Sequence, residues 1–132
     1  MSFVQEIELQ SFGDSRGQLV ALESNKQVPF DIKRVYYIVG TGQGISRGFH
    51  AHKQLKQLAV CVKGSCKMIL DNGYEKIVVL MDSETKGILI EHMIWREMHD
   101  FSDDCVLLVL ASEHYDESDY IRDYDKFKSL VN

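Results

Sequence analysis

The chain of 132 residues has room for one hydrophobic core and for one domain over residues 1–132, and no apolar run in it is long enough to cross a membrane. Its net charge of −5 argues against binding nucleic acid through phosphate neutralisation. The N-terminus has no basic segment followed by an apolar one, and the three cysteines form no Cys-x-x-Cys pair; we therefore expect no signal peptide, reduced thiols packed as small hydrophobes, and a cytoplasmic location.

The chain is mostly a series of short strands. An apolar strand is expected at residues 3–9, then a turn at residues 14–17, and residues 34–39 alternate with period two. Turns are also predicted at residues 63–65 and 71–73. Further strands are predicted at residues 58–62, 66–70, 77–81, 88–90 and 105–110.

Only the tail has a helical pattern. Ser118 can open a helix, after which Tyr120, Tyr124, Phe127 and Leu130 fall near one face. Many short strands joined by turn residues indicate two packed sheets. We therefore predict an all-β fold, a jelly-roll barrel or sandwich of the cupin type, with a short C-terminal helix.

A histidine pair stands in the segment of residues 47–52. On a strand, His50 and His52 project from one face, and Gly48 allows a ligand to approach the backbone. The alternative is two histidines that are merely exposed or packed in the core. Because the pair is closely spaced and flanked by Arg47 in a β-rich chain, we favour a functional site.

The same pair raises the question of a metal site. No carboxylate occurs at residues 53–57, and Lys56 would repel a cation. His99 offers a third ligand, but nothing obvious offers a fourth. We therefore predict that no metal or other cofactor is bound there, and that a neutral imidazole moves protons instead.

Three further segments are ambiguous when taken alone. Residues 14–17 read as a plain turn, residues 95–100 as an edge strand or loop with a charge pair, and Tyr36 and Tyr37 as core or rim residues of a barrel. A phenol near a histidine can also relay a proton.

Taken together, six segments resemble the dTDP-sugar 3,4-ketoisomerase family, in colinear order over nearly the whole chain. They are residues 14–17, 33–37, 47–52, 64–66, 95–101 and 115–122. The resemblance implies a homodimeric, metal-free jelly roll that acts on dTDP-4-keto-6-deoxyglucose and moves its ketone from C4 to C3. The product would supply 3-amino-3,6-dideoxy sugars for bacterial surface glycans such as O-antigen or S-layer glycans.

The resemblance also implies roles for single residues. His50 is the base that removes the C3 hydrogen, His52 orients or stabilises the enediolate, and Tyr36, with Tyr37 as the alternative, carries a proton between the two oxygens. Substrate contacts are expected from four further residues: Arg16, Arg47, Arg96 and His99. Arg16 suits members with galacto products and Arg96 suits members with gluco products, so the C4 configuration stays open.

Three other functions compete with this one. A dTDP-sugar 3,5-epimerase is a related jelly roll that also uses a His base and a Tyr acid. A non-catalytic sugar-binding module and a metal-dependent cupin oxygenase are the others. We also expect the strand at residues 3–9 to cross to the partner of a homodimer, because pairing protects exposed sheet edges.

Overall fold

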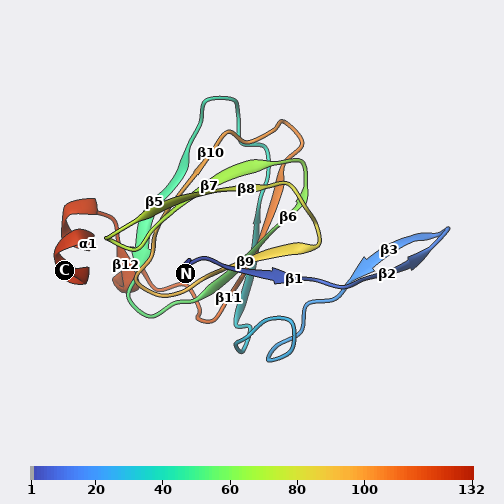
Figure 1. Cartoon of the computed structure of the whole chain (residues 1–132), viewed down its shortest axis with the longest axis horizontal. Helices are drawn as coiled ribbons and strands as arrows, with labels where there is room; N and C mark the ends of the chain where they lie inside the picture. The colour runs from blue at the N-terminus through green and yellow to red at the C-terminus, as the bar shows by residue number, and fades with distance from the viewer. Residues whose placement is uncertain (1) are drawn as a thin grey trace.

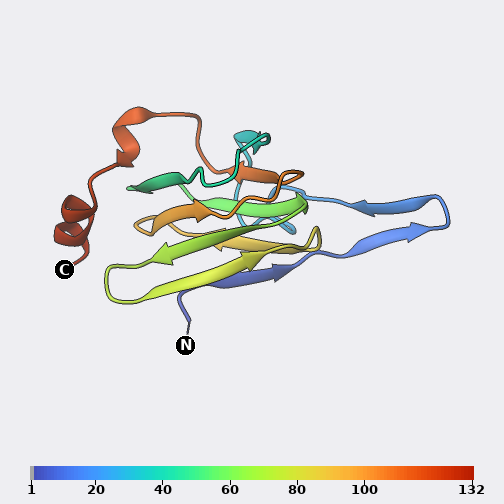
Figure 2. The ribbon, with the colours of Figure 1, turned by 90° about the horizontal axis from the view of Figure 1, so that it is seen from above.

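Two five-stranded antiparallel sheets face each other in the computed structural model, which describes residues 2–132 (Figures 1 and 2). The first sheet contains, in spatial order, β1 (Gln5–Glu8), β9 (Lys86–Ile90), β6 (Gln57–Lys63), β11 (Val106–Ala111) and β4 (Arg34–Ile38). The second contains β12 (Tyr120–Ile121), β5 (Arg47–His52), β10 (Trp95–His99), β7 (Cys66–Asp71) and β8 (Lys76–Met81). The predicted all-β sandwich is confirmed.

The main core lies between the two sheets. The first sheet contributes side chains such as Ala59 and Leu107, and the second contributes Met68 and Leu70. The outer face of the first sheet is covered as well, because Leu58 packs with residues of the segment that precedes β4. Strand β6 is thus buried on both faces, which explains its unbroken apolar run at residues 58–62.

The C-terminal segment differs from its prediction. Residues Glu117–Asp119 form a single 3-10 turn, Tyr120 and Ile121 pair with β5 as strand β12, and helix α1 (Tyr124–Val131) begins only after its N-cap Asp123. The prediction of a helix from Ser118 was wrong because Asp123 supplies the cap, accepting from the Lys126 amide at 3.0 Å. Helix α1 covers the outer face of the second sheet, where Phe127 packs against Trp95.

The N-terminal segment also differs. Strand β1 pairs with β9 of its own chain, so the expected crossing of residues 3–9 to a partner is wrong for this structure. The next two strands, β2 (Ser11–Asp14) and β3 (Gly17–Val20), form a hairpin with the predicted turn at its tip. The hairpin projects from the sandwich on the side opposite α1 and β12 (Figures 1 and 2).

Within residues 2–132, no helix has the length and apolar character needed to span a membrane.

Candidate active site

The histidine pair lies on strand β5, opposite strand β10. His50 pairs in register with Arg96, and the imidazole rings of His50 and His52 lie 4.9 Å apart, centroid to centroid. Between them, Ala51 points to the other face and packs in the cluster beneath α1. The predicted common orientation of the two histidines is therefore confirmed.

A carboxylate fixes the orientation of His52. Its Nδ1 lies 3.2 Å from Oδ2 of Asp119, and the same carboxylate accepts hydrogen bonds from the amides of Gln54 (2.8 Å) and Leu55 (3.3 Å). Asp119 accepts a hydrogen bond from Nδ1–H, so His52 Nε2 is left as an unprotonated acceptor inside the sandwich. The ring is only 1% exposed, which removes it from direct exchange with bulk water.

Arg96 is a buried cation that forms no ion pair with a carboxylate among residues 2–132. It is 2% exposed, and its guanidinium donates to the side-chain oxygen of Gln57 and, at 3.0 Å, to the carbonyl oxygen of Ile94. Isolated buried charge is costly. A positive charge held in this way is suited to stabilising negative charge that develops on a bound substrate.

The tyrosine pair on β4 splits between the two faces of its sheet. The Tyr36 hydroxyl accepts a hydrogen bond from Gln57 Nε2 at 2.8 Å and packs against the main core. Tyr37, by contrast, is 65% exposed on the outer face. The chain Tyr36–Gln57–Arg96 therefore connects the phenol to the buried cation, and Tyr37 takes no part in it.

His50 and Tyr36 line the same hollow, which has a volume of about 420 Å³. Three of the residues in its wall are arginines and none is acidic, but Arg122 is already paired with the nearby Glu117 carboxylate at 2.7 Å. The lining residues are Arg34, Tyr36, Ile38, Arg47, Gly48, His50, Met98, Tyr120 and Arg122. A second hollow of about 520 Å³ adjoins it, sharing Arg34 and Tyr120 and containing His52. The arginines of the first hollow favour an anionic ligand that carries a small polar group.

Both histidines are held neutral. Burial, followed by the charge of Arg96, lowers the pKa of His50 to about 4 and that of His52 to about 2. Burial also lowers the pKa of Arg96 to about 10, so that it is still charged at neutral pH. A neutral imidazole beside a fixed cation can accept a proton from carbon while the cation stabilises the resulting anion.

Four buried nitrogen atoms around the hollows have no hydrogen-bond partner within residues 2–132. They are Arg34 Nε, His50 Nδ1, His52 Nε2 and Arg96 Nε. Buried polar atoms are nearly always paired. These atoms gather at one place, where they remain available to hydrogen-bond a polar molecule.

Two of the predicted substrate contacts lie away from this site within one chain. Arg16 is at the hairpin tip, 89% exposed and paired with Asp14 at 2.6 Å. His99 lies on the opposite face of β10 from Arg96, where it contacts Ser46 at 2.7 Å and Glu97 at 3.0 Å. In a single chain, therefore, Arg16, Tyr37 and His99 do not meet the histidine pair, whereas Arg47 does.

The sequence analysis missed several residues that shape the site. Tyr120 stacks near both histidines, with ring centroids 4.9 Å from His50 and 4.3 Å from His52, and Arg122 lies over its ring. Tyr120 was assigned to a helix, which hid its place. Gln57 had a detectable signal, because it is a polar residue at an inward-facing position of an apolar strand.

Metal ligation by the histidine pair has no support from its neighbours. In the described part of the chain, one group of three His, Cys, Asp or Glu side chains lies close enough together to hold a metal ion. That group contains neither His50 nor His52. Lys56 forms an ion pair with Glu91 at 3.7 Å. The absence of metal chemistry in this site stays a prediction.

Comparisons with known proteins agree with the geometry. Residues 3–132 match the family described as WxcM-like, C-terminal (FdtA). A TDP-4-oxo-6-deoxy-alpha-D-glucose-3,4-oxoisomerase from Aneurinibacillus thermoaerophilus is 56% identical over 118 residues, covering 89% of this chain and 85% of the relative.

Two solved structures extend the likeness to the fold. One is a His-to-Asn mutant of the 3,4-ketoisomerase from Thermoanaerobacterium thermosaccharolyticum in complex with TDP-4-keto-6-deoxyglucose (42% identity, TM-score 0.96, covering 99% of this chain and 96% of that one). The other is a TDP-quinovose 3,4-ketoisomerase from Campylobacter jejuni (44% identity, TM-score 0.93, covering 98% and 99%). The resemblance found in the sequence is thus confirmed, and the chain belongs to the WxcM-like (FdtA) family, whose relatives named here are sugar 3,4-ketoisomerases.

Proposed function

We propose that this chain is a metal-free 3,4-ketoisomerase, with one catalytic domain, that converts dTDP-4-keto-6-deoxyglucose into the corresponding 3-keto sugar. The observation that carries the proposal is the single hollow shared by His50, Tyr36 and three arginines, with no carboxylate in its wall. His50 and Tyr36 are suited to act on the sugar as base and proton carrier, and the arginines are suited to bind its diphosphate.

The reaction moves one proton from C3 to C4 and another from the C3 oxygen to the C4 oxygen, and it needs no oxidant. His50 removes the hydrogen from C3, and its electron pair forms a C3–C4 double bond while the C4 oxygen gains a proton, which gives an enediol. Loss of the proton from the C3 oxygen and return of a proton to C4 produce the C3 ketone. We assign to Tyr36 the transfer between the two oxygens, because its hydroxyl faces the same hollow as His50.

His52 and Arg96 stabilise the charge that develops on the enediolate. Asp119 fixes the His52 ring, and the Gln57 amide bridges Arg96 to the Tyr36 hydroxyl. Because these groups are buried and already oriented, they need no reorganisation when the anion forms.

The test is incubation with dTDP-4-keto-6-deoxyglucose in D₂O, followed by NMR. An isomerase moves the ketone to C3, a 3,5-epimerase leaves it at C4 with inverted neighbours, and a sugar-binding module leaves the substrate unchanged. His50→Asn should lower turnover at least ~10²–10⁴-fold while dTDP still binds. Near-normal turnover by this variant contradicts the role of His50. Loss of activity on chelation that a divalent metal restores contradicts the metal-free mechanism.

Arg96 bears on the configuration at C4. Arginine stays charged at neutral pH, so it positions the sugar or a water but does not itself return the proton to C4. That proton arrives through Tyr36, which protonated His50 resupplies with the proton taken from C3. We favour the gluco product, dTDP-3-keto-6-deoxyglucose. The fresh product of the wild type and of Arg96→His is reduced, and NMR coupling constants then give the configuration at C4. If both proteins give the same ratio of C4 epimers, Arg96 has no part in the stereochemistry.

We further propose a cytoplasmic homodimer in which the β2–β3 hairpin crosses to the partner. Its exposed apolar residues Phe12 and Leu19 support this, as does the open edge strand β4, whose outer face exposes Val35 and Tyr37. Arg16 at the hairpin tip can then contact substrate in the partner's site, which a single chain does not allow. Light scattering at micromolar concentration should report a dimer, and a monomer contradicts the proposal.

A further inference from the structure

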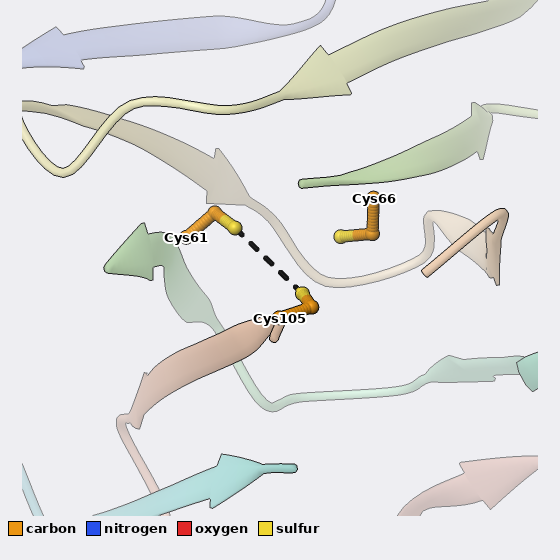
Figure 3. A group of neighbouring side chains, drawn as sticks. All are labelled: Cys61, Cys66 and Cys105. Carbon is orange, nitrogen blue, oxygen red and sulfur yellow. Dashed lines mark hydrogen bonds between the residues drawn. The ribbon is translucent and has the colours of Figure 1, made fainter. Parts of the chain in front are cut away.

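All three cysteines of the chain meet in the core, away from the histidine pair. Cys61 lies near the end of β6, Cys66 begins β7, and Cys105 comes directly before β11 (Figure 3). Their sulfur atoms lie within 4.8 Å of one another, and the sulfurs of Cys61 and Cys105 are 3.7 Å apart. Along β6, Cys61 is four residues from Gln57, or about 13 Å, so the cluster and the histidine site occupy opposite ends of the sandwich.

The backbone around the cluster is tightly constrained. The turn at residues 63–65 passes from one sheet to the other and places Cys61 and Cys66 on facing sheets. Gly64 has φ +70°, and a Cβ there would lie 2.8 Å from Cys105 Cα. Ser65 and Ser102 exchange two hydrogen bonds of 2.9 Å, which tie this turn to the segment that carries Cys105. The three thiols are therefore held together before any ligand arrives.

The spacing of the sulfurs fits a shared ion. Two thiolates that each bind one ion at about 2.3 Å lie about 3.5 to 3.8 Å apart, for bond angles from about 100° to the tetrahedral value. The Cys61–Cys105 separation already lies in this range. Packing as small hydrophobes explains why each cysteine is buried, but not why all three sulfurs converge on one point.

The surroundings select the kind of ion. Within residues 2–132, no His, Asp or Glu ligand belongs to the group. Phe101 and Leu107 belong to the same core cluster, and Cys61 also borders a surface hollow that contains Asp82. A divalent ion with three thiolates would bury a net negative charge and would need a fourth ligand. A trivalent, three-coordinate ion forms a neutral complex with three thiolates and needs no other donor.

We propose that Cys61, Cys66 and Cys105 form a binding site for a trivalent thiophilic metalloid, of which arsenite is the simplest probe. Arsenous acid exchanges its three hydroxyl groups for the sulfurs of three thiols, and each thiol proton leaves with one hydroxyl group as water, so no electron transfer and no further reactant are required. Cys61 borders a surface hollow of about 380 Å³ beside Asp82, which gives the probe an entry route.

The test uses the intact reduced protein and sodium arsenite. Native mass spectrometry should show one adduct per chain, with a mass gain of one arsenic atom less three hydrogens. Alkylation after denaturation should fall from three thiols to none. Zn²⁺ serves as the comparison and should bind more weakly than arsenite.

The matched controls are Cys66→Ala and Cys105→Ala, which keep the site apolar, together with Cys66→Ser. Each should bind arsenite at least about tenfold more weakly and should still melt cooperatively. Absence of the adduct in the wild type, equal affinity in the two-thiol variants, or tighter binding of Zn²⁺ than of arsenite overturns the proposal. Isomerase activity of the alanine variants should persist, so this test is independent of the proposed function.

Discussion

At the residue scale, the site depends on one cation that the protein does not neutralise. Arg96 is buried, and its hydrogen-bond acceptors are the neutral oxygens of Gln57 and Ile94. Burial, followed by the charge of Arg96, lowers the pKa of the neighbouring His50, and Gln57 links the Arg96 guanidinium to the Tyr36 hydroxyl. One buried guanidinium thus acts on both the proposed base and the proposed proton carrier.

The tyrosine pair offers a matched comparison. Tyr36→Phe removes a hydroxyl from a residue that lines the same hollow as His50, and it should lower kcat ~10²–10⁴-fold. Tyr37→Phe removes a hydroxyl on the exposed outer face and should leave kcat nearly unchanged. Steady-state kinetics of the two variants measures the difference. Equal losses, or a larger loss for Tyr37→Phe, contradict the assignment of Tyr36.

The lowered pKa of His50 predicts an unusual pH profile. The base acts in its neutral form, so activity is lost as pH falls through its pKa. For an ordinary histidine, kcat/KM would fall below about pH 6.5. Here kcat/KM should stay level until the pH approaches the value of about 4 that burial and Arg96 impose. An acid limb centred near pH 6.5 would contradict the tuning of His50.

At the element scale, strand β5 reaches β10 only through an unusual backbone at Gly48. Its φ is +91°, and a Cβ there would lie 2.9 Å from the carbonyl oxygen of Arg96. The next residue, Phe49, also has a positive φ of 60°. This irregularity coincides with a shift in register between the two strands and sets the position of His50 relative to Arg96.

Gly48→Ala should therefore disturb both stability and catalysis. Gly40→Ala is the control, because Gly40 also has a positive φ of 68° but has open space where its Cβ would be. Both variants carry the conformational cost, but only Gly48→Ala adds a clash, of about 1–3 kcal/mol. Chemical denaturation and kcat of the two variants separate the conformational cost from the clash. Equal losses of stability and of kcat would show that the close approach to Arg96 affects neither quantity.

The strands were predictable from the sequence more readily than the connections. The predicted strands at residues 58–62, 66–70 and 77–81 correspond to β6, β7 and β8, because period two and turn residues are local signals. The tail was not predictable, since pairing of Tyr120 with His52 is a tertiary contact that overrides a local helical pattern. The same limit applies to the partners of His50 and to the meeting of the three cysteines, which only the packing of two sheets creates.

At the scale of the whole molecule, the hairpin β2–β3 extends away from the sandwich that it belongs to (Figure 2). Arg16 at its tip is separated from the histidines of its own chain, although the family resemblance assigns it to the substrate. A second copy of the chain reconciles these two facts, because a closed two-fold dimer would deliver each tip to the other subunit.

Mixing two inactive variants tests this arrangement. His50→Asn lacks the base and Arg16→Ala lacks the proposed contact, so each homodimer should be impaired. If Arg16 acts in the partner's site, co-refolded heterodimers contain one site with both residues and should regain activity. Activity of the mixture should then exceed the sum of its parts. Mass spectrometry verifies that heterodimers have formed. If they have formed and activity does not rise, Arg16 acts in the site of its own subunit or in neither site.

The arginine-lined hollow has a consequence for the direction of the reaction. The diphosphate is unchanged when the ketone moves from C4 to C3, so Arg34, Arg47 and Arg122, if they bind it as proposed, would hold product as firmly as substrate. Binding through an unaltered group does not favour either side of an equilibrium. Net flow through this enzyme is therefore set by whatever removes the 3-keto sugar, and accumulated product competes with fresh substrate for the same hollow.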